Sequence, residues 1–374
     1  MMSPLPSNPN RISARNIKDE FGQKGSTWNI KDYRRSIQRG GVNWPVDDGI
    51  PTSGTIKFSD FHSKQHNIVI LMSGGTGYRQ TILGNKSSID STAYRGTNSG
   101  VRRTSKNIVY IIKTIGSARS DNHRNTCALR TENKNRWYGG NPRGGKVIIR
   151  IGNGGRIYGA GGEGGRGGAY DEEGGRGGNG TSALGLEVNV ESVTVDSGGV
   201  IVAGSGGGGG GGGAREDSRK KRKAGGGGGG GGAGLPSGEG GRGRSGNRRG
   251  EADGRDGSAG NQDNGGNGGR GSDNDEEAGG GGGGGGGALN GVPGAGGPGQ
   301  GEGANRPGEN GKTNGKGGGG GRGECTGGEC KGSTESDGGG DPGFAITRGS
   351  GISQPSLSGQ SRIKGDKNTQ SGVR

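Results

Sequence analysis

Residues 195–206 read Val-Asp-Ser-Gly-Gly-Val-Ile-Val-Ala-Gly-Ser-Gly and run directly into an uninterrupted glycine tract that ends at Gly213. The same pattern occurs 44 residues earlier, where residues 151–162 read Ile-Gly-Asn-Gly-Gly-Arg-Ile-Tyr-Gly-Ala-Gly-Gly. Each copy contains a short apolar run, a Gly-Gly turn, a second short apolar run and further glycines. A repeat of this period predicts stacked units that bury one face only against each other.

Glycine tracts of similar length dominate the chain after this repeat. The tracts are Gly206–Gly213, Gly225–Gly232, Gly279–Gly287 and the shorter Gly317–Gly321, and polar inserts cover 214–224, 233–278 and 288–316. In the left-handed helix with three residues per turn, a glycine chain points its N–H and C=O groups outward and can pack closely, so an eight-residue tract would span about 25 Å. Similar tracts with unequal inserts therefore favour parallel rods joined by loops. A disordered glycine-rich linker is the alternative.

The composition limits both the core and the partners. Of 374 residues, 104 are glycine and 22% are hydrophobic, which excludes a large conventional core. Residues 1–150 carry 25 Lys/Arg against 9 Asp/Glu, whereas residues 151–374 carry 25 against 26. The balanced second half, without an aromatic residue from 207 to 343, lacks the charge and the stacking groups that attract nucleic acid. We find no apolar run long enough to cross a bilayer and no signal peptide.

A short motif is repeated near the N-terminus. Each copy places one aliphatic and one aromatic residue around a Lys and an Asp, which predicts short helical pegs separated by loops. Because this segment has too little apolar surface to fold alone, we expect it to dock on another surface; a flexible leader is the alternative. The expected docking residues are Ile17, Phe21, Ile30, Tyr33, Ile56, Phe58 and Phe61.

The intervening region contains runs rich in β-branched residues, at Asn67–Met72, Ile108–Ile112 and Lys146–Ile151. We predict a small antiparallel sheet or sandwich there. The expected fold class is mostly β and irregular: short N-terminal helical pegs, a small β-domain and a bundle of polyglycine-type extended helices joined by loops. The expected domains are a docking segment (1–66), the β-domain (67–150), the stacked repeats (146–205), the glycine-rich bundle (206–345) and a polar tail (346–374).

Residues for catalysis or metal binding are not arranged in a recognisable pattern. The three histidines form no metal-binding motif, and Cys325 and Cys330 lack a second ligand pair. We expect free thiols there, and a disulfide remains open. The turn at Ser73–Thr81 lacks the lysine of a phosphate-binding loop, and the acidic clusters lie among glycines. We therefore predict a protein that is not an enzyme, with no cofactor and no metal.

The basic cluster Arg219, Lys220, Lys221, Arg222 and Lys223 lies between two glycine tracts of equal length. Such a cluster can bind phosphates or acidic sugars. We interpret it as the apex of a loop that contacts a receptor, in preference to a nucleic-acid site.

The peg motifs, including Ile56-Lys-Phe-Ser-Asp-Phe61, the Asn-Gly-Gly repeat at residue 153 and the glycine tracts together resemble the glycine-rich tail proteins of tailed bacteriophages, from about residue 11 to about residue 345. The resemblance implies a virion structural protein of the tail or tail fibre, assembled in the host cytoplasm. Its pegs would attach to other tail proteins, and its loops would contact a host surface protein or polysaccharide, without membrane insertion. The resemblance leaves a homo-oligomer open. The alternative is an arginine-glycine-type nucleic-acid-binding protein with a disordered second half.

Overall fold

Most ordered elements of the protein are short strands in parallel sheets, accompanied by one α-helix among the described residues. This confirms the expectation of a mostly β and irregular chain. The computed structural model describes residues 5, 11–21, 27–34, 37–39, 42–44, 47, 49–64, 67–72, 75–76, 80–82, 106–117, 123–132, 147–169, 172–215, 223–244, 253–274, 277–278, 280–288, 292–299, 307–321, 324–325, 338–367 and 369–374.

The N-terminal module contains the helical turns that the repeated motif predicts. They are α1 (Ala14–Phe21), η1 (Ile30–Arg34) and η2 (Phe58–Phe61). Local hydrogen bonds fix where they begin, since the Ser13 hydroxyl accepts from the backbone amide of Asn16 at 3.2 Å, next to the start of α1. A hairpin of β1 (Ile37–Arg39) and β2 (Val42–Trp44) follows η1.

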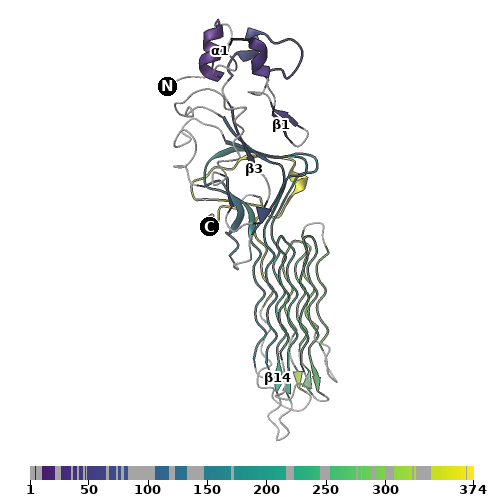
Figure 1. Ribbon diagram of the computed structural model, residues 1–374. Coiled ribbons are helices and arrows are strands. Elements are labelled where there is room, and N and C mark those ends of the chain that lie inside the picture. Colours follow the sequence, from purple (N-terminus) through teal and green to yellow (C-terminus); the bar gives the residue numbers. More distant parts are fainter. Residues whose placement is uncertain are drawn as a thin grey trace.

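Three parallel sheets form the middle of the molecule (Figure 1). The first sheet has the order β20 (Ser356–Ser358), β12 (Val190–Val195), β9 (Val147–Ile151), β6 (Lys106–Ile111) and β3 (Asn67–Met72). The second has the order β21 (Ile363–Lys364), β13 (Val200–Val202), β10 (Arg156–Tyr158), β7 (Thr114–Gly116) and β4 (Gly75–Thr76). The third has the order β19 (Ile346–Arg348), β11 (Ser182–Leu186), β8 (Cys127–Arg130) and β5 (Gln80–Thr81).

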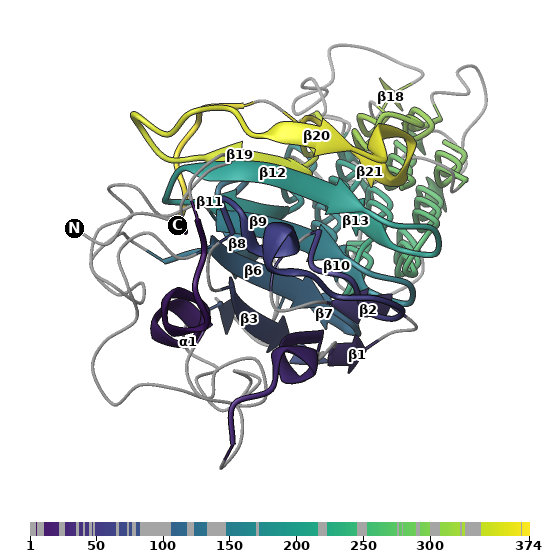
Figure 2. The ribbon, with the colours of Figure 1, turned by 90° about the horizontal axis from the view of Figure 1, so that it is seen from above.

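The chain visits the first, second and third sheets in turn and then returns to the first, so the three sheets are the sides of a parallel β-solenoid. Figure 2 shows the strands of successive turns side by side, from β3 through β6 and β9 to β12. The antiparallel pairing that we predicted for residues 67–150 is wrong: β3 and β6 pair in parallel. Neighbouring strands in the sequence lie in different sheets, and each pairs with a strand one turn away. Short β-branched runs do not encode this difference.

The 44-residue repeat is one turn of the solenoid. Ile157 lies opposite Ile201 in the parallel register of β10 and β13. The turns before these strands also coincide, since Gly154 and Gly198 have φ values of +76° and +79°. This left-handed backbone favours glycine. In the structure the two copies therefore lie on successive turns and pair along β10 and β13.

The solenoid has one buried apolar core. Along each strand the side chains alternate, so that in β10 Ile157 faces the core and its neighbours face outward. The last strands of the three sheets come from residues 346–374, which the sequence suggested to be a polar tail. The fully or almost fully buried core residues include Ile70, Met72, Val109, Ile111, Ile115, Leu129, Ile149, Ile151, Leu184, Leu186, Val193, Ile346 and Ile363.

The glycine-rich chain leaves the solenoid twice, at the same corner. One excursion (159–181) separates β10 from β11, and the other (203–345) separates β13 from β19. Both excursions form extended segments that lie side by side below the solenoid in Figure 1, and we call this assembly the glycine bundle. Its described segments are 159–168, 173–181, 203–213, 225–233, 237–244, 254–260, 265–272, 280–288, 292–299, 307–312, 316–321 and 338–343.

Backbone hydrogen bonds join these segments with a period of three residues. Along 206–213, three successive amides donate to three different segments, and the fourth amide returns to the first of these. The donor and acceptor pairs are Gly207 to Gly178 (2.9 Å), Gly208 to Gly230 (2.7 Å), Gly209 to Gly318 (2.9 Å) and Gly210 to Gly175 (2.8 Å). Each tract therefore uses its backbone groups in several directions, unlike a strand, which pairs on two sides.

The position of a segment in the bundle explains its composition. Residues 206–213 and 280–287 are glycine and buried throughout. At the edge, residues 159–168 carry a larger side chain at every third position, as with Glu163 and the exposed Arg166. The same spacing occurs in the insert 233–278, whose order the sequence left open; Asn267 and Arg270 are exposed there. A glycine pattern with a larger residue at every third position is thus the signal of an edge segment.

Candidate functional site

The glycine bundle has two different ends. Its proximal end adjoins the solenoid, and its distal end lies farthest from it, where β14 is labelled in Figure 1. Proximal connections are short turns, such as 261–264, where the Asn261 side chain accepts hydrogen bonds from the amides of Asp263 and Asn264. Distal connections are longer on average, and include 214–224, 244–254, 271–280, 299–307 and 321–338. The longer connections therefore leave the bundle at one end.

Two small sets of strands mark the distal end. β14 (Ala214–Arg215) pairs in an antiparallel manner with β15 (Lys223–Ala224). Beside them lie β16 (Asp273–Asn274), β17 (Glu277–Ala278) and β18 (Glu324–Cys325), paired in that order. The connection between β14 and β15 is rich in Arg and Lys, and the one between β16 and β17 is acidic. Loops of opposite charge thus start from adjacent hairpins.

The predicted receptor-contact residues fall almost entirely outside the described part of the chain. Arg219, Lys220, Lys221 and Arg222 lie there, whereas Lys223 belongs to β15 and stands opposite Arg215. The structure therefore places only the stem of this connection, β14 and β15, at the distal end.

The predicted docking residues come together in the N-terminal module. Ile17, Phe21, Tyr33, Ile56 and Phe61 are buried in one cluster, and the rings of Phe21 and Phe61 meet edge to face with centroids 5.8 Å apart. The three motif copies thus supply a small core of their own.

Two of the predicted docking residues lie at the border of this core. Phe58 is 40% exposed and lies against Trp28, with ring centroids 6.0 Å apart. Ile30 is half-buried. Among the described residues of the module, Phe58 is the large apolar side chain most open to a partner. The repetition of the motif revealed the core, but gave no sign of which aromatic residue stays outside.

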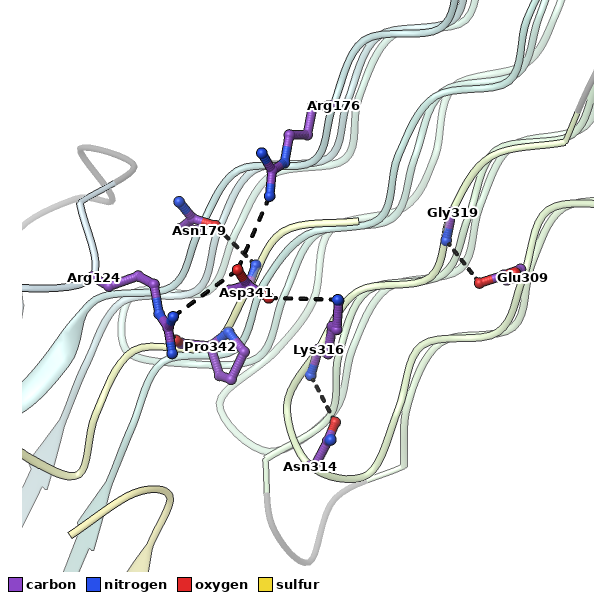
Figure 3. Close-up of polar contacts among 9 residues, drawn as sticks. All are labelled: Arg124, Arg176, Asn179, Glu309, Asn314, Lys316, Gly319, Asp341 and Pro342. Carbon is purple, nitrogen blue, oxygen red and sulfur yellow. Dashed lines mark hydrogen bonds and ion pairs between the residues drawn. The ribbon is translucent and has the colours of Figure 1, made fainter. Parts of the chain in front are cut away.

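Polar contacts hold the last segment of the bundle to the solenoid (Figure 3). The Asp341 carboxylate lies 3.7 Å from Lys316 Nζ and 4.0 Å from both Arg124 and Arg176. Arg124 also donates to the carbonyl of Pro342 at 2.6 Å. Each exposed ion pair contributes little by itself. Together they join one solenoid loop to three glycine-rich segments.

An apolar contact lies elsewhere at the same junction. Leu235, in a proximal turn, packs near Tyr158 and Val202 of the second sheet. Its carbonyl accepts from the amide of Ser117 at 3.0 Å. A Cβ added to Gly116 would lie 2.9 Å from the Leu235 side chain, so the turn lies directly on the solenoid.

The described part of the chain shows no candidate metal centre. No group of three metal-ligating side chains occurs among those residues. Burial raises the pKa of the Cys127 thiol well above its ordinary range, which keeps it protonated. Cys330 and the side chain of Cys325 lie outside the described residues.

None of the described helices has the length and apolar character needed to span a bilayer. No family model matches the chain, and no significant match was found among curated proteins or solved structures.

Proposed function

We propose that the glycine segments are polyglycine-type extended helices packed as a bundle. The three-residue hydrogen-bonding period supports this, because this helix has three residues per turn. The glycines within 206–213 and 225–232 also lack the positive φ values that the turn residues Gly234 and Gly315 have. A left-handed extended helix has negative φ.

Hydrogen exchange tests this proposal. The backbone amides of 206–213, 225–232 and 282–286 should exchange far more slowly than those of an unfolded glycine peptide, because each donates a hydrogen bond inside the bundle. Exchange at the unfolded rate in all three tracts would overturn the bundle and return the second half of the chain to a linker.

We propose further that the chain is a virion structural protein of a tailed bacteriophage, in the tail or tail fibre. The observation that carries this proposal is the location of the long connections at the distal end, remote from the N-terminal module. A rigid bundle that holds loops at one end suits contact with a host surface protein or polysaccharide, because loops on a fixed scaffold tolerate variation. The N-terminal module at the other end would join other tail proteins.

The nucleic-acid alternative receives less support. It needs a flexible, basic second half, whereas the described glycine segments have bonded backbones and charges of both signs. Flexible arginine-glycine chains bind because they can wrap and stack on bases.

Antibodies against the peptide 216–222 provide the test of function. Gold-labelled antibody applied to particles from cells that carry this gene should decorate the ends of tail fibres in electron micrographs and should block adsorption. A variant with 216–222 replaced by a Gly-Ser loop of equal length is the matched control and should lose the label. Particles with no label, or with label only on the capsid, would overturn the assignment.

A further inference from the structure

A pocket of about 570 Å³ opens where the second sheet of the solenoid meets the proximal end of the bundle. The solenoid contributes β10, β13 and β21, and the bundle contributes the turn 261–264 and Ala288. Ligand sites occur preferentially at such junctions between structural units, and typical ones measure about 300–1,000 Å³. The pocket lies at the opposite end of the bundle from the distal loops.

Strand alternation determines which side chains line the pocket. Ile157 and Ile363 face the solenoid core, so their neighbours Arg156, Tyr158 and Lys364 face outward into the lining. The chain thus places charged and aromatic side chains of different turns on one outward surface.

The lining combines an apolar floor with a charged rim. Tyr158, Val202 and Ala288 belong to one buried apolar cluster. Arg156 and Lys364 line the same pocket. A third cation, Arg362, completes the rim, against Asp263 as the one acidic side chain of the lining. The excess of positive charge in a concave site favours an anionic ligand.

The polar groups of the lining also narrow the ligand class. Asp263 accepts hydrogen bonds only, whereas the side chains of Gln262 and Ser361 can both donate and accept. Tyr158 contributes an aromatic ring, and burial raises the pKa of its hydroxyl, which therefore remains protonated at neutral pH. A ligand that carries hydroxyl groups beside its acid group can donate to Asp263, whereas a simple anion would only be repelled by it.

We propose that this pocket binds an anionic saccharide, with the carboxylate or phosphate of the sugar held by Arg156, Arg362 and Lys364 and a sugar hydroxyl donating to Asp263. The apolar floor takes the face of the sugar ring. This site does not involve the distal loops, so the saccharide proposal can be tested independently of the proposed function.

Titration calorimetry with the full-length protein tests the proposal. The probes are trigalacturonate, which carries carboxylates, glucose 6-phosphate, which carries a phosphate, and the uncharged maltotriose. At least one anionic probe should bind, and maltotriose should bind at least about tenfold more weakly, since charge-assisted hydrogen bonds are the stronger ones. Added salt should weaken the anionic complex. The absence of binding by both anionic probes, or equal binding of maltotriose, would overturn the proposal.

Substitutions that remove either the positive or the negative charges of the pocket make the test more specific. The double substitution Arg156→Gln and Lys364→Gln should weaken the anionic complex by about tenfold or more, whereas Asp263→Asn should not weaken binding of the acid group and should reduce selectivity for sugars over inorganic phosphate. Lys312→Gln removes an exposed cation in another proximal turn and is the matched control, with unchanged affinity expected. Equal losses in the double variant and in Lys312→Gln would assign the binding to general charge and overturn the site.

Discussion

The solenoid and the glycine bundle use side chains in opposite ways. In the solenoid, Ile157 and its counterparts in other turns fill a common core, and stacking depends on their bulk. In the bundle, a Cβ added to Gly210 would lie 1.9 Å from the carbonyl oxygen of Arg166, so stacking depends on having no side chain. One region is held by apolar burial and the other by backbone hydrogen bonds.

The two regions also differ in which residues specify the alignment of neighbouring segments. The register of a solenoid turn is specified by the apolar residues of its strands, as the pairing of Ile157 in β10 with Ile201 in β13 shows. An edge segment of the bundle is specified by the third position, where Glu163 and Arg166 face out of the bundle. An all-glycine tract has no register of its own, because each of its residues is identical. This difference predicts which changes each region tolerates.

Inserting one glycine after Gly164 should have the largest effect. The segment is held at β10, so the insertion would move Arg166 to the place of Gly167, where a Cβ lies 2.0 Å from the carbonyl oxygen of Gly226. A buried, unpaired arginine costs about 3–5 kcal/mol. We expect loss of hydrogen-exchange protection throughout the neighbouring glycine segments.

The matched control is one glycine inserted within 206–213. There the extra residue can pass into the distal connection without placing a side chain inside the bundle. Protection should be kept. Equal effects of the two insertions would contradict a register set by every third residue.

Replacing a side chain of the solenoid tests the other half of the comparison. Ile157→Ala should lower the free energy of unfolding by about 2–5 kcal/mol, because it removes buried methyl groups and leaves a cavity. Chemical denaturation monitored by circular dichroism would measure the loss. Ile352, which is half-buried beside the core, provides a milder control through Ile352→Ala. A loss smaller than that of the control would place Ile157 outside the core.

Gly210→Ala is the reverse of the solenoid substitution, because it adds a methyl group to the bundle. The added Cβ would overlap the backbone of Arg166, and overpacking costs about 1–3 kcal/mol. In a flexible tract the same alanine would leave stability nearly unchanged, because it would restrict the folded and the unfolded chain equally. A fall in melting temperature would therefore support the bundle, and an unchanged melting temperature would support a linker. Arg242→Ala, at an exposed edge position, should change stability little.

The sequence was sufficient to predict the repeat and the positions of the short N-terminal helical turns. Apolar residues at matching positions, such as Ile157 and Ile201, identify a repeating unit by their spacing along the chain. The parallel direction of the strands could not be predicted from the sequence, because the path of a whole solenoid turn decides which strand pairs with β3. That path includes residues far from β3 in the sequence.

The site was less accessible than the fold. The peg motif suggested docking residues, but it did not distinguish Phe21, which is buried against Phe61, from Phe58, which is exposed, because this difference follows from how three helical turns meet. The edge segments inside 233–278 could have been found from the glycine spacing around Asn267 and Arg270. The junction pocket could not have been predicted from the sequence, because Arg156 and Asp263 line one pocket only after the bundle packs against the solenoid.

A smaller prediction concerns a charge in the solenoid, in contrast with the exposed charges of the bundle. Glu187 lies 3.5 Å from Arg130, but neither Glu187 Oε2 nor Arg130 Nε has a hydrogen-bond partner. Burial raises the pKa of Glu187, the Arg130 charge opposes this, and Glu132 adds to it. Folding therefore favours the neutral carboxyl group, so its contribution to stability is fully present below the unfolded pKa of about 4.3. That contribution is lost as the pH rises through the folded pKa.

Glu187→Gln keeps the neutral form at every pH, so at pH 7 it should equal or exceed the wild type by about 1 kcal/mol or less. At pH 4 the two proteins should differ less. Scanning calorimetry at both pH values measures this difference, with Glu191→Gln, an exposed residue of β12, as the control. A variant that is less stable than the wild type at pH 7 but not at pH 4 would show that the pair with Arg130 stabilises the solenoid despite its geometry. The two regions would then also differ in how much their charges contribute to stability. Removing an exposed edge charge of the bundle would change the free energy of unfolding little, whereas removing the half-buried charge of Glu187 would lower it.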